Sequence, residues 1–443
     1  MDVAPAMEKI KEGMDQTMEG KCVLVTGVTG FIGKVIVEKL LYEFPNLKCV
    51  YIMMRGKKAR PPKVPHDISP TERFESDVLN SPIWSLRLRL EGEEEDAFRQ
   101  RIKTRVKAFE GSLGRARCSI SDADWAELST EVDSIIHCAA SVNFNDHLCE
   151  QVATNVVGAS ELIRLLDGPG RDGRQRTFVH VSTCYVGFPK GTTINKIKRG
   201  IRGEVTEGPC VFDHDPEELL QFISKPENRD MVTTRQPSLL RDAGHRNTYT
   251  FSKAMAETLL SARCMAAPET SPKLVIVRPS CVGSAASEPC CGWVDAATAN
   301  GAMFLFAILG YLKYFPGWSQ AISDQIPVDY VANACIIAQA YAPFDTGVPI
   351  RQIHVGSSAG ANPVTWGETG KWIAWTAGIL NYHANPRKLQ LKAPSGWYFV
   401  QVSRRRSFFP FPPNDEHYDA ASSPPFAPFA PPFLVVGAAT AVF

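Results

Sequence analysis

The sequence predicts an α/β fold built on a doubly wound parallel sheet, with a smaller second part. Short apolar runs, which are typical of strands buried on both faces, alternate along the chain with stretches of helical periodicity. No hairpin signal separates these runs, so helices are expected to connect parallel strands. The first unit begins at residue 21, with a strand over 22–26, a helix over about 31–44 and a second strand over 49–54.

Later segments repeat this pattern. We expect strands over 132–137, 178–182 and 274–277, with helices over 155–166 and 249–263. Residues 56–105 depart from it, with a proline-rich piece followed by a charged piece that we interpret as a solvated helix. Residues 188–247 form a polar insertion. The tail from about residue 393 is rich in Pro, Phe and Ala without a defensible period, which predicts irregular or disordered chain.

The composition excludes several classes of protein. The 443 residues carry 48 basic and 47 acidic side chains, so no net field favours nucleic acid. The twelve cysteines form no C-x-x-C pair, which predicts a reducing compartment and no zinc site. The polar N-terminus lacks the apolar core of a signal peptide, and no run reaches the roughly 18 to 20 apolar residues of a membrane span. We therefore expect a soluble intracellular protein.

The turn between the first strand and the first helix reads TGVTGFIG and predicts a dinucleotide site. Glycines let the backbone turn sharply and approach a pyrophosphate, which then sits on free N–H groups at the helix N-terminus. The last glycine lets the helix pack close to the strand. A purely structural tight turn is the alternative. The residues expected to contact the cofactor here are Gly27, Thr29, Gly30, Phe31, Ile32 and Gly33.

The end of the second strand indicates which dinucleotide binds. NAD sites place a carboxylate there, whereas this strand continues into Arg55, Lys57 and Lys58. A guanidinium can hold a 2′-phosphate in bidentate fashion. The sequence therefore favours NADP(H), with Arg55 and Lys57 as ligands, although at least one of the two lysines is expected to be merely solvated.

A catalytic set is expected downstream of this turn. Tyr249 and Lys253 are four residues apart, hence on one helix face, where the ammonium would lower the pKa of the phenol. Such a tyrosine can exchange a proton with a carbonyl oxygen. Ser182 and Thr183 end a strand, and one hydroxyl there could donate to the same oxygen. Thr183 is favoured, but the choice stays open. His137 is expected to be a satisfied core residue.

Several segments, in this order along residues 21–375, together resemble the fatty acyl-CoA reductases, members of the extended short-chain dehydrogenase/reductase superfamily. They read VTGVTGFIGKVIVEKLL, HCAASVNF, FVHVSTCYVG, NTYTFSKAMAE, IVRPSCVGSAASEPCCGWVD, DQIPVDYVANA and IHVGSSAGANPVTWGE. The resemblance implies a Rossmann fold and NADPH-dependent reduction of a long-chain acyl-CoA, usually through the aldehyde to the alcohol, with release of CoA. It also implies that the protein acts as a peripheral protein at the cytosolic face of a membrane, such as that of the peroxisome or endoplasmic reticulum.

Site residues follow from the resemblance by motif. Arg55 would hold the adenosine phosphate, and Tyr249 and Lys253, with Thr183 or Ser182, would be catalytic. Cofactor contacts are further expected from Ala139, Tyr249, Lys253, Pro279 and Val282. The chain departs from the family where Ser112 stands in place of an acid that contacts adenine. Its C-terminal region also looks cut short after about Lys392.

The expected domains are an N-terminal extension at 1–20, an NADP-binding domain at 21–285, a substrate-binding part at 286–392 and the tail at 393–443. The apolar run at 302–309 could line an acyl groove or form a buried helix. Two alternatives stay open. A nucleotide-sugar epimerase or dehydratase shares the turn and the Tyr/Lys pair, but usually prefers NAD. A non-enzymatic NADP-binding protein would not need the pair.

Overall fold

The computed structural model describes residues 4–59, 66–84, 95–187, 215–295, 299–308, 316–317, 319–345, 349–358, 363–379 and 398–399. The expectation for the tail after residue 399 lies outside these residues, as does that for 188–214 of the predicted insertion.

A seven-stranded sheet forms the centre of the fold, and every adjacent pair of its strands is parallel. The strand order is β10-β6-β5-β4-β1-β2-β3, which confirms the predicted doubly wound sheet. The strands are β1 (Cys22–Thr26), β2 (Cys49–Met54), β3 (Val106–Glu110), β4 (Ser134–His137), β5 (Thr177–Val181), β6 (Lys273–Pro279) and β10 (Ile350–Val355).

The strand order reverses direction between β1 and β4, and this switch point is where open α/β sheets bind their ligands. Thr26, the last residue of β1, is in register with His137, the last residue of β4. His137 is in turn in register with His180 of β5. The carboxyl ends of the central strands therefore meet at one edge, and their loops can form a common site.

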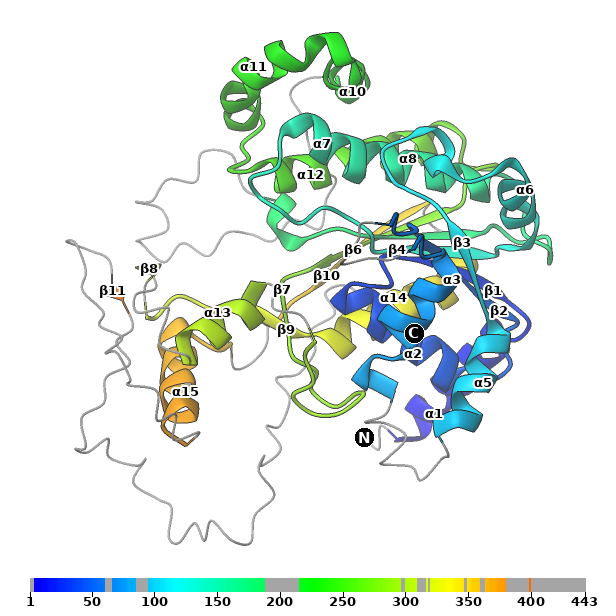
Figure 1. The fold of residues 1–443 in the computed structure, drawn as a ribbon, viewed down its shortest axis with the longest axis horizontal. Coiled ribbons are helices and arrows are strands. Elements are labelled where there is room, and N and C mark those ends of the chain that lie inside the picture. The colour runs from blue at the N-terminus through cyan, green and yellow to red at the C-terminus, as the bar shows by residue number, and fades with distance from the viewer. Residues whose placement is uncertain are drawn as a thin grey trace, which may run out of the picture.

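Helices cover both faces of the sheet (Figure 1). One face carries α1 (Ala4–Met18), α2 (Phe31–Glu43), α3 (Pro70–Arg73), α5 (Glu95–Arg105) and α14 (Val328–Tyr341). The other carries α6 (Asp122–Glu131), α7 (Leu148–Val152), α8 (Gly158–Leu162) and α12 (Thr248–Ala266). Short 3-10 or π turns are η1 (Phe74–Leu79), η2 (Ala116–Ser119), η3 (Ala153–Val157), η4 (Ile163–Leu166), η5 (Cys184–Val186), η6 (Pro226–Asn228) and η7 (Ala342–Phe344).

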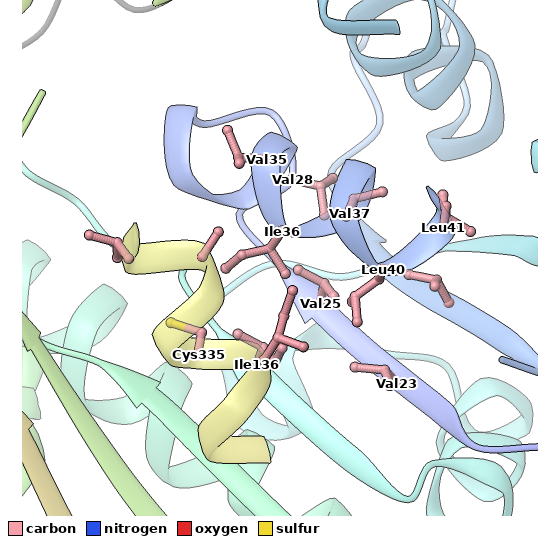
Figure 2. Close-up of a cluster of buried hydrophobic side chains, with 14 of the residues drawn as sticks. Val23, Val25, Val28, Val35, Ile36, Val37, Leu40, Leu41, Ile136 and Cys335 are labelled. Atoms are coloured by element: carbon pink, nitrogen blue, oxygen red, sulfur yellow. The ribbon is translucent and has the colours of Figure 1, made fainter. Parts of the chain in front are cut away.

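The core between α2 and the sheet follows from the predicted helical spacing. Ile36 and Leu40 of α2 pack toward Val23 and Val25 of β1, with Cys335 of α14 beside them (Figure 2). All five side chains are fully buried. Because burying one such aliphatic side chain stabilises the fold by about 1.5–3 kcal/mol, this cluster fixes α2, and with it the glycine turn, against β1.

The remaining elements lie beside this layered core. Residues 215–247 of the predicted polar insertion include α10 (Pro216–Ser224) and α11 (Arg229–Asp242), which lie over α7 (Figure 1). The second part carries α13 (Ala299–Ile308), α15 (Trp366–Ile379), β7 (Cys281–Gly283), β8 (Pro316–Gly317), β9 (Gln325–Pro327) and β11 (Tyr398–Phe399). Among the described residues, none of the helices is long and apolar enough to cross a membrane.

Candidate active site

The glycine turn after β1 leaves an open cradle at the N-terminus of α2. Gly27 has a positive φ of 76°, and a Cβ placed there would lie 2.8 Å from the backbone nitrogen of Ala139. A Cβ on Gly33 would lie 2.3 Å from the carbonyl oxygen of Gly27. The N-cap residue, Gly30, provides no side-chain hydrogen bond to the helix. The N–H groups of the first turn are thus accessible to a pyrophosphate, and the residues fit a dinucleotide.

The segment after β7 packs along α2 next to this cradle. The ring of Trp293 stacks on Phe31, the first residue of α2, with ring centroids 5.6 Å apart. Lys34 forms an ion pair with Asp295. Ile32 is half-buried, whereas Thr29 in the turn is exposed. The start of α2 is therefore fixed by contacts from the second part of the chain, while the turn itself faces solvent.

The cationic cluster after β2 is only partly available to a cofactor. Lys57 forms an ion pair with Asp77 at 3.0 Å, and Lys58 forms one with Asp67 at 2.8 Å. The exposed Arg55 accepts a 2.6 Å hydrogen bond from Arg73 at its backbone oxygen. No described residue is recorded as a partner of the Arg55 guanidinium. Of the predicted phosphate ligands, Arg55 is therefore the one whose charge is not already matched by an acid within the described chain.

The start of α12 sets the position of the catalytic pair. The Asn247 side chain caps the helix by accepting a 2.8 Å hydrogen bond from the Thr250 amide. Lys253 is buried, with 2% exposed area, and its ammonium donates a 2.7 Å hydrogen bond to the Val181 carbonyl. Tyr249, one turn earlier, lies close enough to Thr183 for that side chain to act on the pKa of the phenol. The structure therefore brings Tyr249, Lys253 and Thr183 together at the carboxyl end of β5.

The electrostatics of this pair differ from the prediction. Burial raises the pKa of Tyr249 to about 12, with the Thr183 side chain acting in the opposite direction. Burial lowers the pKa of Lys253 to about 8. The expectation that Lys253 lowers the tyrosine pKa is wrong for this structure, because desolvation outweighs the other influences. A phenol that stays protonated at neutral pH is, however, the form needed to donate a proton.

Ser182 and Thr183 have different surroundings. The Thr183 side chain acts on the pKa of Tyr249, and its hydroxyl accepts a 3.3 Å hydrogen bond from the Tyr185 amide. The Ser182 hydroxyl is buried and has no hydrogen-bond partner among the described residues. Of the two candidates, Thr183 is therefore the one placed beside the tyrosine, and it also caps the turn that follows β5.

Asn155, in η3, belongs to the site although its sequence context did not single it out. Its side-chain oxygen accepts a 2.8 Å hydrogen bond from the Ser141 amide. Its side-chain nitrogen donates to the Ser252 hydroxyl at 2.9 Å. Ser141 follows the Ala139 loop, and Ser252 precedes Lys253. This buried amide therefore ties the loop expected to contact the cofactor to the catalytic helix. In the sequence, the only indication of this role is a polar residue within an otherwise apolar helical stretch.

The far side of Tyr249 carries apolar groups. The Phe144 ring lies 5.6 Å from the tyrosine ring and is 58% exposed. Of the predicted nicotinamide contacts, Pro279 ends β6 and is buried, and Val282, in β7, is half-buried. The phenol thus lies near Thr183, from the turn after β5, and near the apolar ring of Phe144. This arrangement can protonate and stabilise an oxygen anion on a carbonyl substrate.

Sequence comparisons relate the chain to a family and to individual proteins. A family model described as male sterility protein, an NAD-binding family, matches residues 25–335. Fatty acyl-CoA reductase 1 of Rattus norvegicus is 31% identical over 355 residues, 80% of this chain and 61% of that protein. The Xenopus laevis protein of the same name is 29% identical over 85% of this chain and 64% of its own. The chain thus spans less than two thirds of these relatives' length.

Solved structures support the fold. The reductase domain of a nonribosomal peptide synthetase from Mycobacterium tuberculosis is 18% identical, with a TM-score of 0.52, covering 82% of this chain and 75% of that one. The terminal R domain of the myxalamid biosynthetic pathway is 20% identical, with a TM-score of 0.50, covering 85% and 76%. At this identity the likeness concerns the fold alone.

Proposed function

We propose a function from the premise that this chain belongs to the male sterility protein family, in agreement with its motif resemblance to the fatty acyl-CoA reductases. The reaction is the NADPH-dependent reduction of a long-chain fatty acyl-CoA, through the aldehyde to the alcohol, with release of CoA. The observation that carries the proposal is the grouping of Thr183, Tyr249 and Lys253 beside a cradle that fits a dinucleotide.

The cofactor would be held by residues at both sides of the switch point. The pyrophosphate would lie on the N–H groups at the start of α2, which the glycine turn leaves accessible. Arg55 would hold the 2′-phosphate, since its guanidinium is not matched by an acid in the described chain. Ala139 closes the cradle at Gly27, and Pro279 and Val282 would border the nicotinamide. When bound, NADPH supplies the hydride for the carbonyl carbon.

Side chains of the site stabilise the negative charge that develops on the substrate oxygen. Thr183 and Tyr249 donate hydrogen bonds to the oxyanion that develops there, and the phenol then passes its proton to it. The nearby Lys253 ammonium stabilises the phenolate left behind. The resulting hemithioacetal loses the CoA thiol to give the aldehyde. With a hydride from a second NADPH, bound after the oxidised cofactor leaves, the same groups would protonate the aldehyde oxygen and yield the alcohol.

The acyl chain needs an apolar environment next to this site. Phe144 provides one surface beside Tyr249. In α13, Leu305 and Phe306 are 45% and 50% exposed, whereas Ala307 is buried. The run predicted at 302–309 is thus a helix whose described side chains are partly accessible. We propose that these surfaces bind the acyl chain at the cytosolic face of a membrane, into which long-chain acyl substrates partition.

A coupled measurement tests the proposal. Purified protein is incubated with NADPH and palmitoyl-CoA while cofactor absorbance and free thiol are followed together. We expect thiol release that requires NADPH and rises in step with its oxidation, and neither change in Tyr249→Phe. Thiol release without cofactor consumption would indicate hydrolysis and contradict the proposal. Turnover of a nucleotide sugar without net cofactor consumption would instead favour the epimerase alternative.

A further inference from the structure

Two buried histidines lie on the sheet beneath α12. His137 ends β4 and His180 lies in β5, and the two are in register. Both are 0% exposed, and their rings stack with centroids 5.6 Å apart. Each interacts electrostatically with the Lys253 ammonium. The two stacked imidazoles and the ammonium, which is bonded to the carbonyl of the residue after His180, therefore lie in one buried region of the fold.

Most ring nitrogens of these histidines lack a hydrogen-bond partner in the described chain. Nδ1 of His137 lies 2.8 Å from the hydroxyl of Thr26. His137 Nε2 and both ring nitrogens of His180 have no hydrogen-bond partner among the described residues. A neutral imidazole always presents one donor and one acceptor. Buried polar groups are nearly always paired, by protein or by water, so these atoms require an explanation.

The Lys253 ammonium also has more donors than it has hydrogen-bond acceptors in the described chain. It carries three donors, and one acceptor is recorded for it in the described chain, the Val181 carbonyl. The buried Ser182 hydroxyl, next along the chain, also lacks a partner. Donors and acceptors that need partners thus lie in the same buried region, where β4, β5 and α12 meet. A buried water, which needs two to four polar partners, would satisfy them together.

We propose that His180, backed by His137, holds a buried water against Lys253 and so keeps the lysine charged while Tyr249 donates its proton. His180 is then a positioning residue that acts through Lys253. The idea rests on the proposed function for its role in turnover, although the water site itself does not. Replacing His180 by an apolar residue would remove the acceptor, make the ammonium less favourable and shift its loss of charge to lower pH.

Other ionisable groups near Lys253 set the background for this titration. Arg278 and Glu257 form a buried ion pair behind it, and Arg278 also contacts the His354 ring at 3.1 Å. The ionisable groups that interact electrostatically with Lys253 are Glu257 from α12, His137 and Cys138 from β4 and its loop, and His180 from β5. From β6 and β10, Arg278 and His354 act on it through Glu257. The main variant of the experiment below changes His180 alone.

The test follows the NADPH dissociation constant from pH 6 to 10 by cofactor fluorescence, beside kcat/KM and the melting temperature. In the unmodified protein, the NADPH dissociation constant should change at alkaline pH. The pH at the midpoint of this change is assigned to Lys253 if the change is absent in Lys253→Met. We expect His180→Leu to lower this midpoint by about one pH unit, the scale of one hydrogen bond to a charged group. His180→Gln, which keeps an acceptor, should shift it less. The melting temperature of His180→Leu should be unchanged or higher.

A second histidine provides the matched control. His245 is also partly buried at the start of α12 and contacts Phe251 at 5.9 Å between rings, but burial alone lowers its pKa. His245→Leu should leave the midpoint in place. An unmoved midpoint in folded His180→Leu, or an equal shift in His245→Leu, would overturn the inference. If His180→Leu does not fold, His137→Leu should show the same downward shift. Absence of turnover in the unmodified protein would refute the proposed function but leave the binding midpoint measurable.

Discussion

The Lys253 ammonium donates a 2.7 Å hydrogen bond to the carbonyl of Val181, the last residue of β5. This bond joins the catalytic helix to the strand whose extension carries Thr183. Thr183 also acts on the pKa of Tyr249, so the start of the helix lies close to the residues that follow the strand. The position of Lys253 thus depends on a bond between two regular elements, whereas Thr183 comes from the turn after β5.

Tyr249→Phe should reduce acyl-CoA reduction to background, since it removes the hydroxyl that donates the proton, while NADPH affinity stays nearly unchanged. Steady-state rates beside a fluorescence titration with NADPH check this. Lys253→Ala should weaken both, because Lys253 is also one of the expected cofactor contacts. If Tyr249→Phe kept most of its activity, another acid would have to protonate the oxyanion.

Thr183→Ala should lower kcat by about 100-fold or more, because it removes one of the two donors beside the oxyanion. Ser182→Ala serves as the matched variant. Its hydroxyl has no partner in the described chain, so its loss should change kcat far less. The comparison is made at saturating NADPH and acyl-CoA. Equal losses in the two variants would show that the Thr183 hydroxyl near Tyr249 is not used in turnover.

The first βαβ unit could be predicted from sequence because its signals are local. The glycine turn, the apolar runs and the helical spacing of α2 all lie within residues 22–54, and the structure places β1, α2 and β2 there. Strand β10 was not predicted. Its sequence, IRQIHV, is only partly buried, and its partner β6 lies far earlier in the chain. No local pattern identifies such an edge strand.

The parts of the site that were not predictable depend on tertiary packing. The choice between Ser182 and Thr183 depends on how α12 docks on β5. The ion pair of Lys57 with Asp77 requires η1 to return to the end of β2. The raised pKa of Tyr249 follows from burial, which the Y-x-x-x-K spacing does not report. Residue types and spacing thus indicated the chemistry, whereas packing decided which group is available for it.

Arg55→Asp should narrow or reverse a strong preference for NADPH over NADH. The loss of one charge-assisted contact to the 2′-phosphate predicts about a 10- to 100-fold weaker affinity for NADPH. Lys57→Met is the control, since Lys57 is already paired with Asp77 and should matter less. Dissociation constants for both cofactors are measured in all three proteins. Equal constants in the unmodified protein would refute the assignment of Arg55.

Gly33→Ala should destabilise the protein and weaken NADPH binding. The added Cβ would meet the Gly27 oxygen at 2.3 Å, so α2 must move away from the turn, at a cost of about 1–3 kcal/mol. Gly13→Ala, in α1, is the control, because its Cβ would meet its nearest atom, the Tyr341 hydroxyl, at an ordinary 3.5 Å. Urea unfolding and NADPH titration check both variants. Unchanged affinity in Gly33→Ala would contradict the close packing of α2 on the turn.

The protein should lose stability as the pH falls below about 6.5, earlier than carboxylate protonation alone would cause. Burial lowers the pKa of His137 from 6.5 to about 3 and that of His180 well below its ordinary value. The unfolded chain therefore binds protons that the folded chain does not bind. The stabilisation present above pH 6.5 is lost as the pH falls toward the pKa of the folded state. For His137 alone, this linkage predicts a loss of about 2.5 kcal/mol in unfolding free energy between pH 7 and 4.5.

Urea unfolding across that range tests this expectation. His137→Leu cannot take up the proton, so its unfolding free energy should change less between pH 7 and 4.5 than that of the unmodified protein. His66→Leu is the control, because His66 is exposed and should leave the slope unchanged. The difference between the two variants isolates the contribution of burial, since each removes one imidazole. Parallel slopes in all three proteins would mean that bulk solvent reaches His137, so that burial does not lower its pKa.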